Sequence, residues 1–230
     1  MDWYRWLDNF LSLIYPTVCM SCGDSLVVGE EIICTTCLHK IPKTNLHLVK
    51  DNPIEKKFWG RVDIESATSY FYYSKGSPFQ KLLHRLKYSK GKEIGVMLGK
   101  IAGLQLVEST RFENIDMLVS VPLHPNKLKK RGYNQSQCIC QGLACAMNLP
   151  IDNHTLIRIV ENPTQTKKST YERWENTNGI FDVYDTEAFE GKHILLVDDV
   201  LTTGSTLIAC IEAIKSKTNA KISVFTIAVA

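Results

Sequence analysis

The chain has no long apolar run. In its 230 residues, no stretch reaches the roughly eighteen consecutive apolar residues that a membrane-spanning helix needs. It also lacks internal repeats and low-complexity tracts, which excludes solenoid and array architectures. The net charge of +3 is too small to decide whether the protein binds nucleic acid. A globular class remains, and a chain with 44% apolar residues can bury one substantial core.

The N-terminal segment also lacks the signature of a signal peptide. Residues 1–16 are apolar and aromatic, but Asp2 and Asp8 interrupt them, basic residues are few, and no small-residue cleavage site follows. Their apolar side chains fall on one helical face, which predicts a helix. We expect this helix to dock on the larger domain, and peripheral contact with a membrane surface is the alternative.

Four of the eight cysteines form two Cys-x-x-Cys pairs, Cys19 with Cys22 and Cys34 with Cys37. The eleven residues between the pairs suit a small hairpin that brings the thiols together. Four thiolates meet the tetrahedral requirement of structural zinc. We therefore predict a small zinc-ribbon-like unit, with a disulfide pair or a rubredoxin-like iron site as the alternatives.

The other four cysteines, Cys138, Cys140, Cys145 and Cys210, lie in apolar helical sequence without paired spacing. This placement is expected of reduced core residues. Together with the absence of a signal peptide, it predicts a cytoplasmic protein.

Length and patterning divide the chain into three parts. Residues 1–42 are expected to hold the N-terminal helix and the four-cysteine unit, which is too small to fold without a metal. Residues 43–60 are charged and weakly periodic, so they suit a linker or an extended connection more than a core element. Residues 61–230 are expected to form an α/β domain.

Strands and helices alternate within residues 61–230. Strands are predicted at 66–73, 115–121, 156–160, 179–183, 194–197 and 222–229, and helices at 79–106 with a break near 89–91, at 134–148 and from 207 to about 217. This alternation predicts a mainly parallel sheet with helices on both faces.

The most informative stretch is HILLVDDVLTTGST, residues 193–206. Ile194 to Val197 predicts a buried strand, so Asp198 and Asp199 are expected at its carboxyl end, where open α/β sheets bind ligands. A turn and a helix N-terminus follow, and their N–H and hydroxyl groups suit a phosphate. These residues are Thr202, Thr203, Gly204, Ser205 and Thr206. Two carboxylates would repel a neighbouring phosphate unless they faced hydroxyls or a metal ion. The hydroxyls of a ribose can donate to both carboxylates. The alternative is an ordinary Asp-rich turn and helix cap.

A second candidate site follows the 115–121 strand. Residues 121–150 hold four lysines or arginines and no acidic residue, which suits a pyrophosphate group. Arg131 is the strongest candidate, because a guanidinium holds two phosphate oxygens at once. His124 and Lys127 are weaker candidates, and a turn anchor or a solvated basic loop is the alternative.

Residues 193–206 resemble the motif with which type I phosphoribosyltransferases bind phosphoribosyl pyrophosphate (PRPP). In that motif an acidic pair holds the ribose 2′- and 3′-hydroxyls and the next loop holds the 5′-phosphate. With the four-cysteine unit, the run from Arg131 to Gln135, and Gln165 followed by Arg173-x-x-Asn176, nearly the whole chain resembles the ComF family. Lys127 departs from the arginine that relatives often carry.

The resemblance implies a type I phosphoribosyltransferase-like fold and a role in DNA uptake or in the use of incoming single-stranded DNA. It implies that PRPP is held by Asp198, Asp199 and residues 202–206, with Mg²⁺ on the bound pyrophosphate. It also implies a mobile loop, expected at residues 165–175. The pyrophosphate and loop contacts implied are His124, Lys127, Arg131, Gln165 and Arg173.

Two function classes follow. The first is a phosphoribosyltransferase in which Arg131, Asp198 and Asp199 are catalytic. The second is an accessory factor that senses a nucleotide and contacts single-stranded DNA or competence proteins through the zinc unit and the basic residues between 75 and 100. No sequence feature identifies a nucleobase pocket, so the acceptor is unknown.

Overall fold

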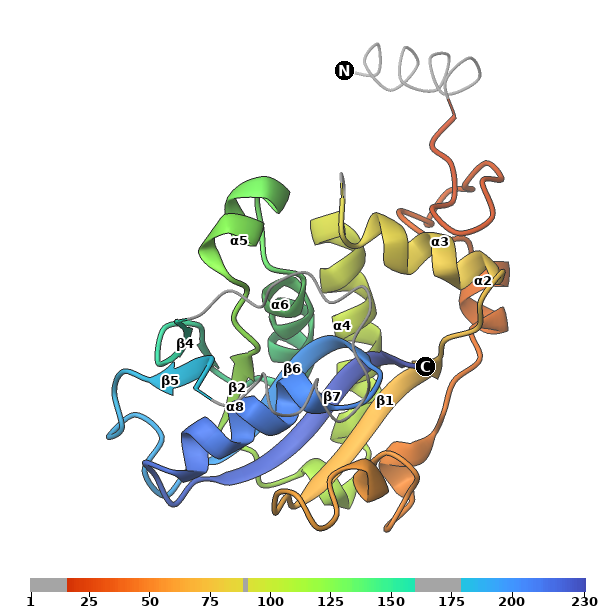
Figure 1. Cartoon of the computed structure of the whole chain (residues 1–230). Helices are drawn as coiled ribbons and strands as arrows, with labels where there is room; N and C mark the ends of the chain where they lie inside the picture. Colours follow the sequence, from red (N-terminus) through yellow and green to blue (C-terminus); the bar gives the residue numbers. More distant parts are fainter. Residues whose placement is uncertain (1–15, 89–90, 160–178) are drawn as a thin grey trace, which may run out of the picture.

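The computed structural model describes residues 16–88, 91–159 and 179–230. Within them, five parallel strands form the central sheet in the spatial order β1-β7-β6-β2-β3 (Figure 1). Their bounds are Ser66–Tyr72 for β1, Met117–Ser120 for β2, Ile151–Asp152 for β3, His193–Leu201 for β6 and Lys221–Val229 for β7. The central strands β6 and β7 consist largely of β-branched and other apolar residues, which suits strands buried on both faces.

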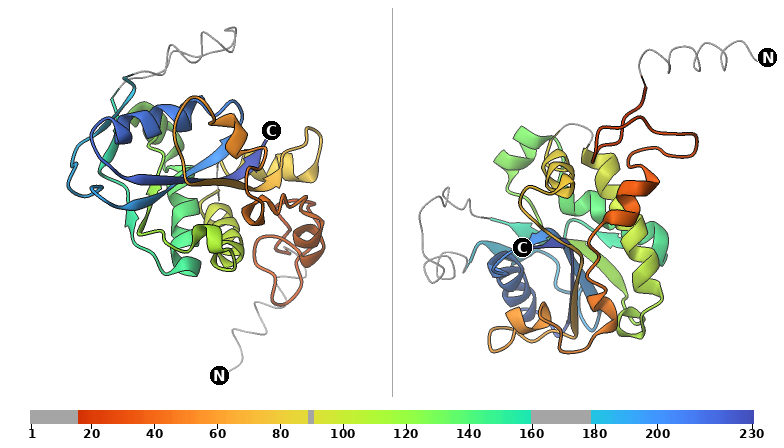
Figure 2. Two further views of the ribbon diagram at one scale, coloured as in Figure 1. Left: turned by 90° about the horizontal axis from the view of Figure 1, so that it is seen from below. Right: turned by 90° about the vertical axis from the view of Figure 1, so that its right-hand side faces the viewer.

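Helices cover both faces of the sheet. The two helices α4 (Gly91–Val107) and α6 (Gln135–Met147) pack on one face, and α8 (Ser205–Lys215) packs on the other (Figure 2, left). Two apolar clusters correspond to these two layers, one with Leu195 and Val197 and the other with Ile194 and Leu196. The predicted fold class, a mainly parallel sheet with helices on both faces, is therefore confirmed.

The remaining elements lie around this sandwich. They are α2 (Thr35–Lys40), α3 (Pro78–Arg85), α5 (Pro125–Arg131), the 3₁₀ turns η1 (Leu46–Leu48), η2 (Glu55–Lys57) and η3 (Thr110–Phe112), and the strands β4 (Leu156–Arg158) and β5 (Phe181–Val183). In the described part of the chain, no helix is long and apolar enough to cross a membrane. The predicted helix at 1–16 lies outside the described residues, apart from Pro16.

The two short strands expected at 156–160 and 179–183 exist as β4 and β5, but they are not part of the central sheet. They pair with each other antiparallel, and the short β3 takes the edge position beside β2 instead. Strand patterning shows that a segment is extended and half buried, but it does not show which neighbour it pairs with.

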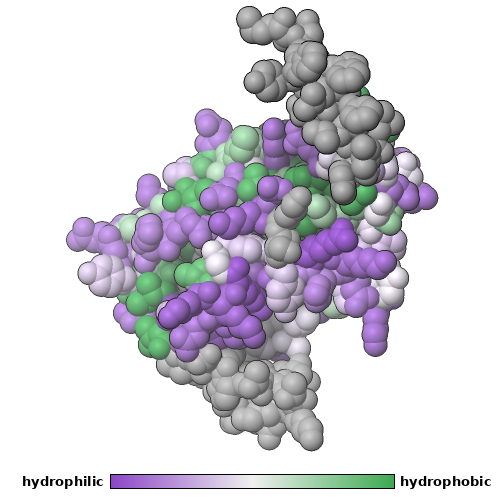
Figure 3. Space-filling model, turned by 90° about the horizontal axis from the view of Figure 1, so that it is seen from above, coloured by the Kyte–Doolittle hydropathy of each residue, from purple (hydrophilic) through white to green (hydrophobic). Residues whose placement is uncertain are grey.

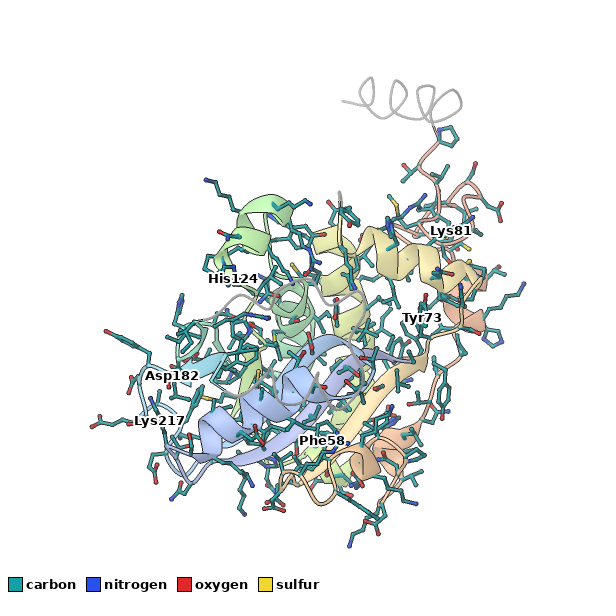
Figure 4. The ribbon with its side chains drawn as sticks, viewed as in Figure 1. Phe58, Tyr73, Lys81, His124, Asp182 and Lys217 are labelled. Carbon is teal, nitrogen blue, oxygen red and sulfur yellow. The ribbon has the colours of Figure 1, made fainter. Side chains whose placement is uncertain are left out.

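The segment 43–60 differs from a simple linker. Ile54 and Phe58 are fully buried beside α8 and the sheet, and Figure 4 labels Phe58 there. The Asn52 side-chain amide donates to the carbonyls of Val49 and Ala67 at 3.0 and 2.9 Å. The expectation that this segment contributes no core element is wrong for Ile54 and Phe58, because two apolar residues four apart are too few to produce a visible period.

Close contact between α4 and α6 fixes the position of α6. A Cβ atom on Gly142 would lie 2.0 Å from the carbonyl oxygen of Val96, and one on Gly99 would lie 2.2 Å from that of Ile139. Only glycine permits backbones to approach this closely. The N-terminus of α6 is thereby held above the carboxyl end of the sheet.

Candidate functional site

The acidic pair lies where β6 extends past its neighbour β2. The last paired residue of β2, Ser120, lies opposite Val197, and the chain then turns away at Pro122. On the other side, β7 continues beside β6 and pairs Asp198 with Thr226. The prediction that the strand ends after Val197 is therefore wrong, because β7 keeps supplying backbone partners as far as Leu201. On the β2 side, β6 has no paired strand residue beyond Val197, so the edge of β6 is open there.

This open edge is the topological switch point of the sheet. From β2 the chain passes through α6 to β3 on one side, whereas from β6 it passes through α8 to β7 on the other. Ligands of open α/β proteins bind at such points, outside the carboxyl ends of the strands. The switch point therefore lies between β6, which carries the acidic pair, and β2.

The loop after β6 leads into α8 as expected. Gly204 has φ +81°, a left-handed conformation that favours glycine, and it is the N-cap of α8. The hydroxyls of Thr203 and Ser205 are 2.7 Å apart. Asp198 and residues 200–207 line a small hollow at this helix end. The first-turn N–H groups of a helix have no intrahelical acceptor, so the hollow suits an anion.

The two carboxylates are not equivalent. The Ser136 hydroxyl, at the start of α6, donates to Asp198 Oδ1 at 2.9 Å, and the Asp199 backbone N–H donates to the same oxygen at 2.8 Å. Burial raises the pKa of Asp198 to about 7, and the charge of Asp199 adds to this effect. Asp198 is thus held from within the protein, while Asp199 points toward a lysine.

Two lysines that the sequence did not single out reach this site. Lys87, just after α3, places its Nζ 3.6 Å from Asp199 Oδ2. Lys57, from η2, donates from its Nζ to the Thr202 carbonyl at 2.8 Å. Both come from segments more than one hundred residues away in the chain, so no local motif reveals them.

The basic stretch after β2 forms α5. His124 is its N-cap, and its Nδ1 accepts from the Asn126 backbone N–H at 3.1 Å, so this side chain anchors the turn. Lys127 lies on α5, a helix without buried residues, and Arg131 near its end donates to Gln135 Oε1 at 3.1 Å. Their contacts with a phosphate remain predictions. Gln165 and Arg173, and the loop expected at 165–175, lie outside the described residues.

The residues after Arg131 serve the site in ways that the sequence did not show. The Asn134 side-chain amide donates to the Val121 carbonyl at 2.9 Å, which ties the start of α6 to the end of β2. Tyr133 Oη lies 2.7 Å from the Leu86 carbonyl and 2.8 Å from that of Tyr88. The run from Tyr133 to Ser136 therefore touches both the segment that carries Lys87 and the acidic pair.

A groove of about 750 Å³ opens beside the acidic pair, between α3 and the end of β6. Tyr73 and Lys81, labelled in Figure 4, lie on its walls together with Lys87, Val200 and Thr202. None of the lining side chains is acidic. Hydrophilic residues cover much of this side of the molecule (Figure 3).

The four cysteines of the N-terminal unit come together as predicted. The ligand atoms of Cys19, Cys22, Cys34 and Cys37 all lie within 4.8 Å of one another, and no disulfide joins them. The Sγ atoms of Cys22 and Cys34 are 3.8 Å apart. Tetrahedral zinc with Zn–S bonds of about 2.3 Å places its sulfurs about 3.8 Å apart, so the cluster fits this metal.

Backbone N–H groups prepare the cluster for a cation. Burial alone would raise the pKa of the Cys19 thiol, but N–H groups of Cys34, Cys22 and Ser21 lower it to about 6. Burial raises the pKa of Cys37, and the charge on Cys19 adds a smaller contribution. A bound cation would relieve this repulsion between thiolates.

The remaining cysteines are only partly as expected. Cys138, Cys140 and Cys210 are buried, whereas Cys145 is exposed on α6. Burial raises the pKa of the Cys140 thiol, which makes it an inert core thiol.

Comparison with known proteins places the chain in a family. Residues 148–229 match the family model described as Phosphoribosyl transferase domain. The DNA utilization protein YhgH of Salmonella typhimurium is 31% identical over 206 residues, which cover 85% of this chain and 89% of that protein. Competence protein ComFC of Bacillus subtilis is 37% identical over 91 residues, which cover 40% of this chain and 35% of that protein. The chain belongs to the ComF family.

Among solved structures, the glutamine PRPP amidotransferase from B. subtilis, complexed with ADP and GMP, aligns with this ComF chain at 16% identity and a TM-score of 0.43. The alignment covers 63% of this chain and 30% of the amidotransferase chain.

The span that matches the phosphoribosyl transferase domain contains only part of the site. It includes β6, the acidic pair, the Thr202 to Thr206 loop and α8. The supporting residues Lys57, Lys87, Tyr133 and Ser136 lie before residue 148. In this ComF chain, therefore, a shared motif is completed by residues from outside the matched span.

Proposed function

We propose that the protein binds PRPP, or a related ribose 5-phosphate compound, at the carboxyl edge of its sheet. The observation that carries this proposal is the extension of β6 beyond β2, where the acidic pair immediately precedes the loop that leads into α8 and Asp198 lines the hollow at the N-terminus of this helix. The Asp199 carboxylate can accept from ribose hydroxyls, while the loop from Thr202 to Thr206 takes the 5′-phosphate.

In the enzymatic form of this proposal, an acceptor nucleophile attacks C1′ of PRPP and pyrophosphate leaves. The chain orients the ribose through its acidic pair and holds the 5′-phosphate at the helix end, so catalysis consists mainly of positioning and charge stabilisation. Arg131 is our candidate for stabilising the departing pyrophosphate. Mg²⁺, which prefers phosphate and carboxylate oxygens, would neutralise the diphosphate when bound beside the pair.

The binding proposal is tested by calorimetric titration of PRPP with Mg²⁺. We expect Asp199→Asn to weaken binding by about 1.5–3 kcal/mol, roughly 10- to 150-fold, because a charge-assisted hydrogen bond is lost. Asp182→Asn is the matched control, since Asp182 lies on β5 and pairs with Lys217 away from the site (Figure 4). Unchanged binding by Asp199→Asn would show that the pair faces another ligand.

Transfer itself is tested by pyrophosphate release from PRPP in the presence of candidate acceptors. Release that exceeds the background and disappears in Asp199→Asn supports an enzyme. Tight PRPP binding without release, for every acceptor tried, supports the accessory-factor class.

For the N-terminal unit we propose one structural zinc ion on Cys19, Cys22, Cys34 and Cys37. The unit buries few apolar side chains of its own, so its folding depends on the metal. Elemental analysis should give about one zinc per chain, and Cys34→Ser should lose it. Less than about half an equivalent of zinc, with normal folding of Cys34→Ser, would refute this assignment, and iron would support the rubredoxin-like alternative.

A role in DNA uptake or use is supported by the names of the relatives, DNA utilization protein and competence protein. We place this role in the cytoplasm, because no disulfide joins the described cysteines.

Direct contact with single-stranded DNA is the second candidate, favoured by the groove without acidic side chains beside α3. Binding should tolerate any sequence and weaken steeply with salt, and charge-removing substitutions such as Lys81→Met should flatten the salt dependence. No binding at low salt would reject it and leave a role through protein partners.

A further inference from the structure

The matched motif supplies no basic side chain beside the acidic pair. A bound PRPP molecule brings phosphate groups next to Asp198 and Asp199, and like charges at this distance repel one another. The loop from Thr202 to Thr206 offers hydroxyls and N–H groups but no basic side chain. The two lysines that reach the site, Lys57 and Lys87, come from separate segments that both precede the motif by more than one hundred residues.

These lysines touch different parts of the site. Lys57 lies at the phosphate loop, where its Nζ donates to the Thr202 carbonyl. Lys87 lies at the acidic pair and also lines the groove beside α3. Its Nζ is 3.6 Å from Asp199 Oδ2, longer than an ordinary hydrogen bond of about 2.7–3.2 Å, so its donors are not committed to Asp199. The Lys87 side chain is 36% exposed and the Asp199 side chain 18%, so the ammonium stands on the open side of the pair.

The backbone around Lys87 is fixed by tertiary contacts. Arg85 Nη1 donates to the Met20 carbonyl at 2.8 Å, which joins α3 to the four-cysteine unit. On the other side, the Tyr133 hydroxyl shares its proton between the carbonyls of Leu86 and Tyr88, the two neighbours of Lys87.

The Tyr133 hydroxyl is also closely packed against the start of α4. A Cβ atom on Gly91 would lie only 2.0 Å from Tyr133 Oη. Residues 85–88 are therefore held by their contacts with Met20 and Tyr133, and the Lys87 side chain adjusts to a ligand.

Building on the proposed function, we propose that Lys87 contacts the anionic group that the bound ribose carries on C1′, and that Tyr133 positions Lys87 for this contact. The ligand class is a ribose 5-phosphate with a phosphate or diphosphate on C1′. When the ribose hydroxyls donate to the Asp199 carboxylate, the Lys87 ammonium turns to the anionic group on C1′ and remains inside the groove. Lys57 serves the other end of the same ligand, at the 5′-phosphate.

The test compares two ligands, PRPP and ribose 5-phosphate, which differ in the group on C1′. Both are titrated calorimetrically with Mg²⁺ into wild type, Lys87→Met and Lys57→Met. We expect Lys87→Met to weaken PRPP binding about 10-fold or more and ribose 5-phosphate binding less than about 3-fold. Lys57→Met, the matched control, should weaken both ligands by the same factor.

Tyr133→Phe tests the positioning role. It should weaken PRPP binding roughly 3- to 10-fold in the wild-type background and cause no further loss in Lys87→Met, because the hydroxyl acts only through Lys87. Thermal unfolding of every variant checks that the fold is intact. If Tyr133→Phe costs the same factor in both backgrounds, its role is structural and the positioning assignment is wrong.

The outcomes separate this inference from the proposed function. If wild type binds both ligands and Lys87→Met weakens them equally, or weakens neither, the contact with the C1′ group is refuted while the site itself stands. If wild type binds neither ligand, the proposed function fails and this assignment fails with it.

Discussion

Two strand-to-helix connections meet at the candidate site, and they are built differently. The end of β6 and the turn into α8 carry their chemistry in consecutive residues, from Asp198 to Thr206. The β2–α6 connection passes through α5 before Tyr133 contacts the segment that carries Lys87 and Ser136 contacts Asp198. The first is a local motif, and the second works only when distant elements are in place.

The difference shows that the site depends both on local backbone conformation and on tertiary packing. Local order follows from backbone conformation, such as the left-handed Gly204. Tertiary order follows from the close packing of α4 and α6, which sets where the start of α6 lies. Four substitutions test the local and the tertiary contributions, and they are given from the largest expected effect to the smallest.

The largest effect is expected for Gly142→Ala, which attacks the tertiary connection. Its Cβ would lie 2.0 Å from the Val96 carbonyl oxygen, and backbone cannot yield as a flexible side chain does. We expect the free energy of unfolding to fall by about 3 kcal/mol, measured by urea denaturation. Cys145→Ala, at an exposed position of the same helix, should change it by less than about 0.5 kcal/mol. Equal stability of both variants would contradict the importance of this helix contact.

The next effect concerns Asp198 and depends on pH. Its raised pKa means that the folded state binds the proton more tightly than the unfolded state, whose carboxyl titrates near 3.8. Stability from this group is therefore complete below about pH 4 and is lost as pH rises through about 7. Asp198→Asn does not titrate, so its stability relative to wild type should increase with pH, by about 1–3 kcal/mol in total.

Thermal unfolding of wild type and Asp198→Asn between pH 4 and pH 8 provides the measurement. A stability difference that stays constant over this range would show that the carboxyl is not held in its protonated form by the fold. The same variant should lose ligand affinity at pH 8, where wild type presents the carboxylate.

Gly204→Ala attacks the local connection. The residue has φ +81°, and an L side chain in this region costs about 1–2 kcal/mol. We expect the free energy of unfolding to fall by this amount and the affinity for PRPP to fall with it, because the loop that holds the phosphate shifts. Gly132→Ala, with φ +79° at the end of α5, is the control, with a similar stability cost but a smaller effect on affinity. Equal affinity losses in the two variants would argue against a phosphate loop at Gly204.

The smallest effect is expected for Ser136→Ala, which removes one neutral donor from Asp198 Oδ1. The loss should be about 1 kcal/mol, or roughly 5-fold in PRPP affinity by calorimetry. Thr203→Ala removes one hydroxyl from the local loop and should cost a similar amount or less, since backbone N–H groups remain. If Ser136→Ala lost much more PRPP affinity than this without loss of stability, Ser136 would contact the ligand itself.

Much of this protein could be predicted from its sequence. The two Cys-x-x-Cys pairs indicated the cluster that the structure forms. The alternation of apolar strands and amphipathic helices indicated the parallel sheet, and the DDVLTTGST run indicated the strand, turn and helix of the candidate site. Each of these features depends on residues close together in the chain, so spacing alone reveals it.

Tertiary structure decided the rest. The extension of β6 past Asp199 depends on the length of β7, and the approach of Lys57 and Lys87 depends on segments more than one hundred residues away. The pairing of β4 with β5 depends on which strand edge is free. Contacts of this kind are set by how whole elements pack, and a single sequence does not record which surfaces meet. The local motif therefore defines the chemistry of the acidic pair, while the packing of α3, α4 and α6 determines which side chains surround it.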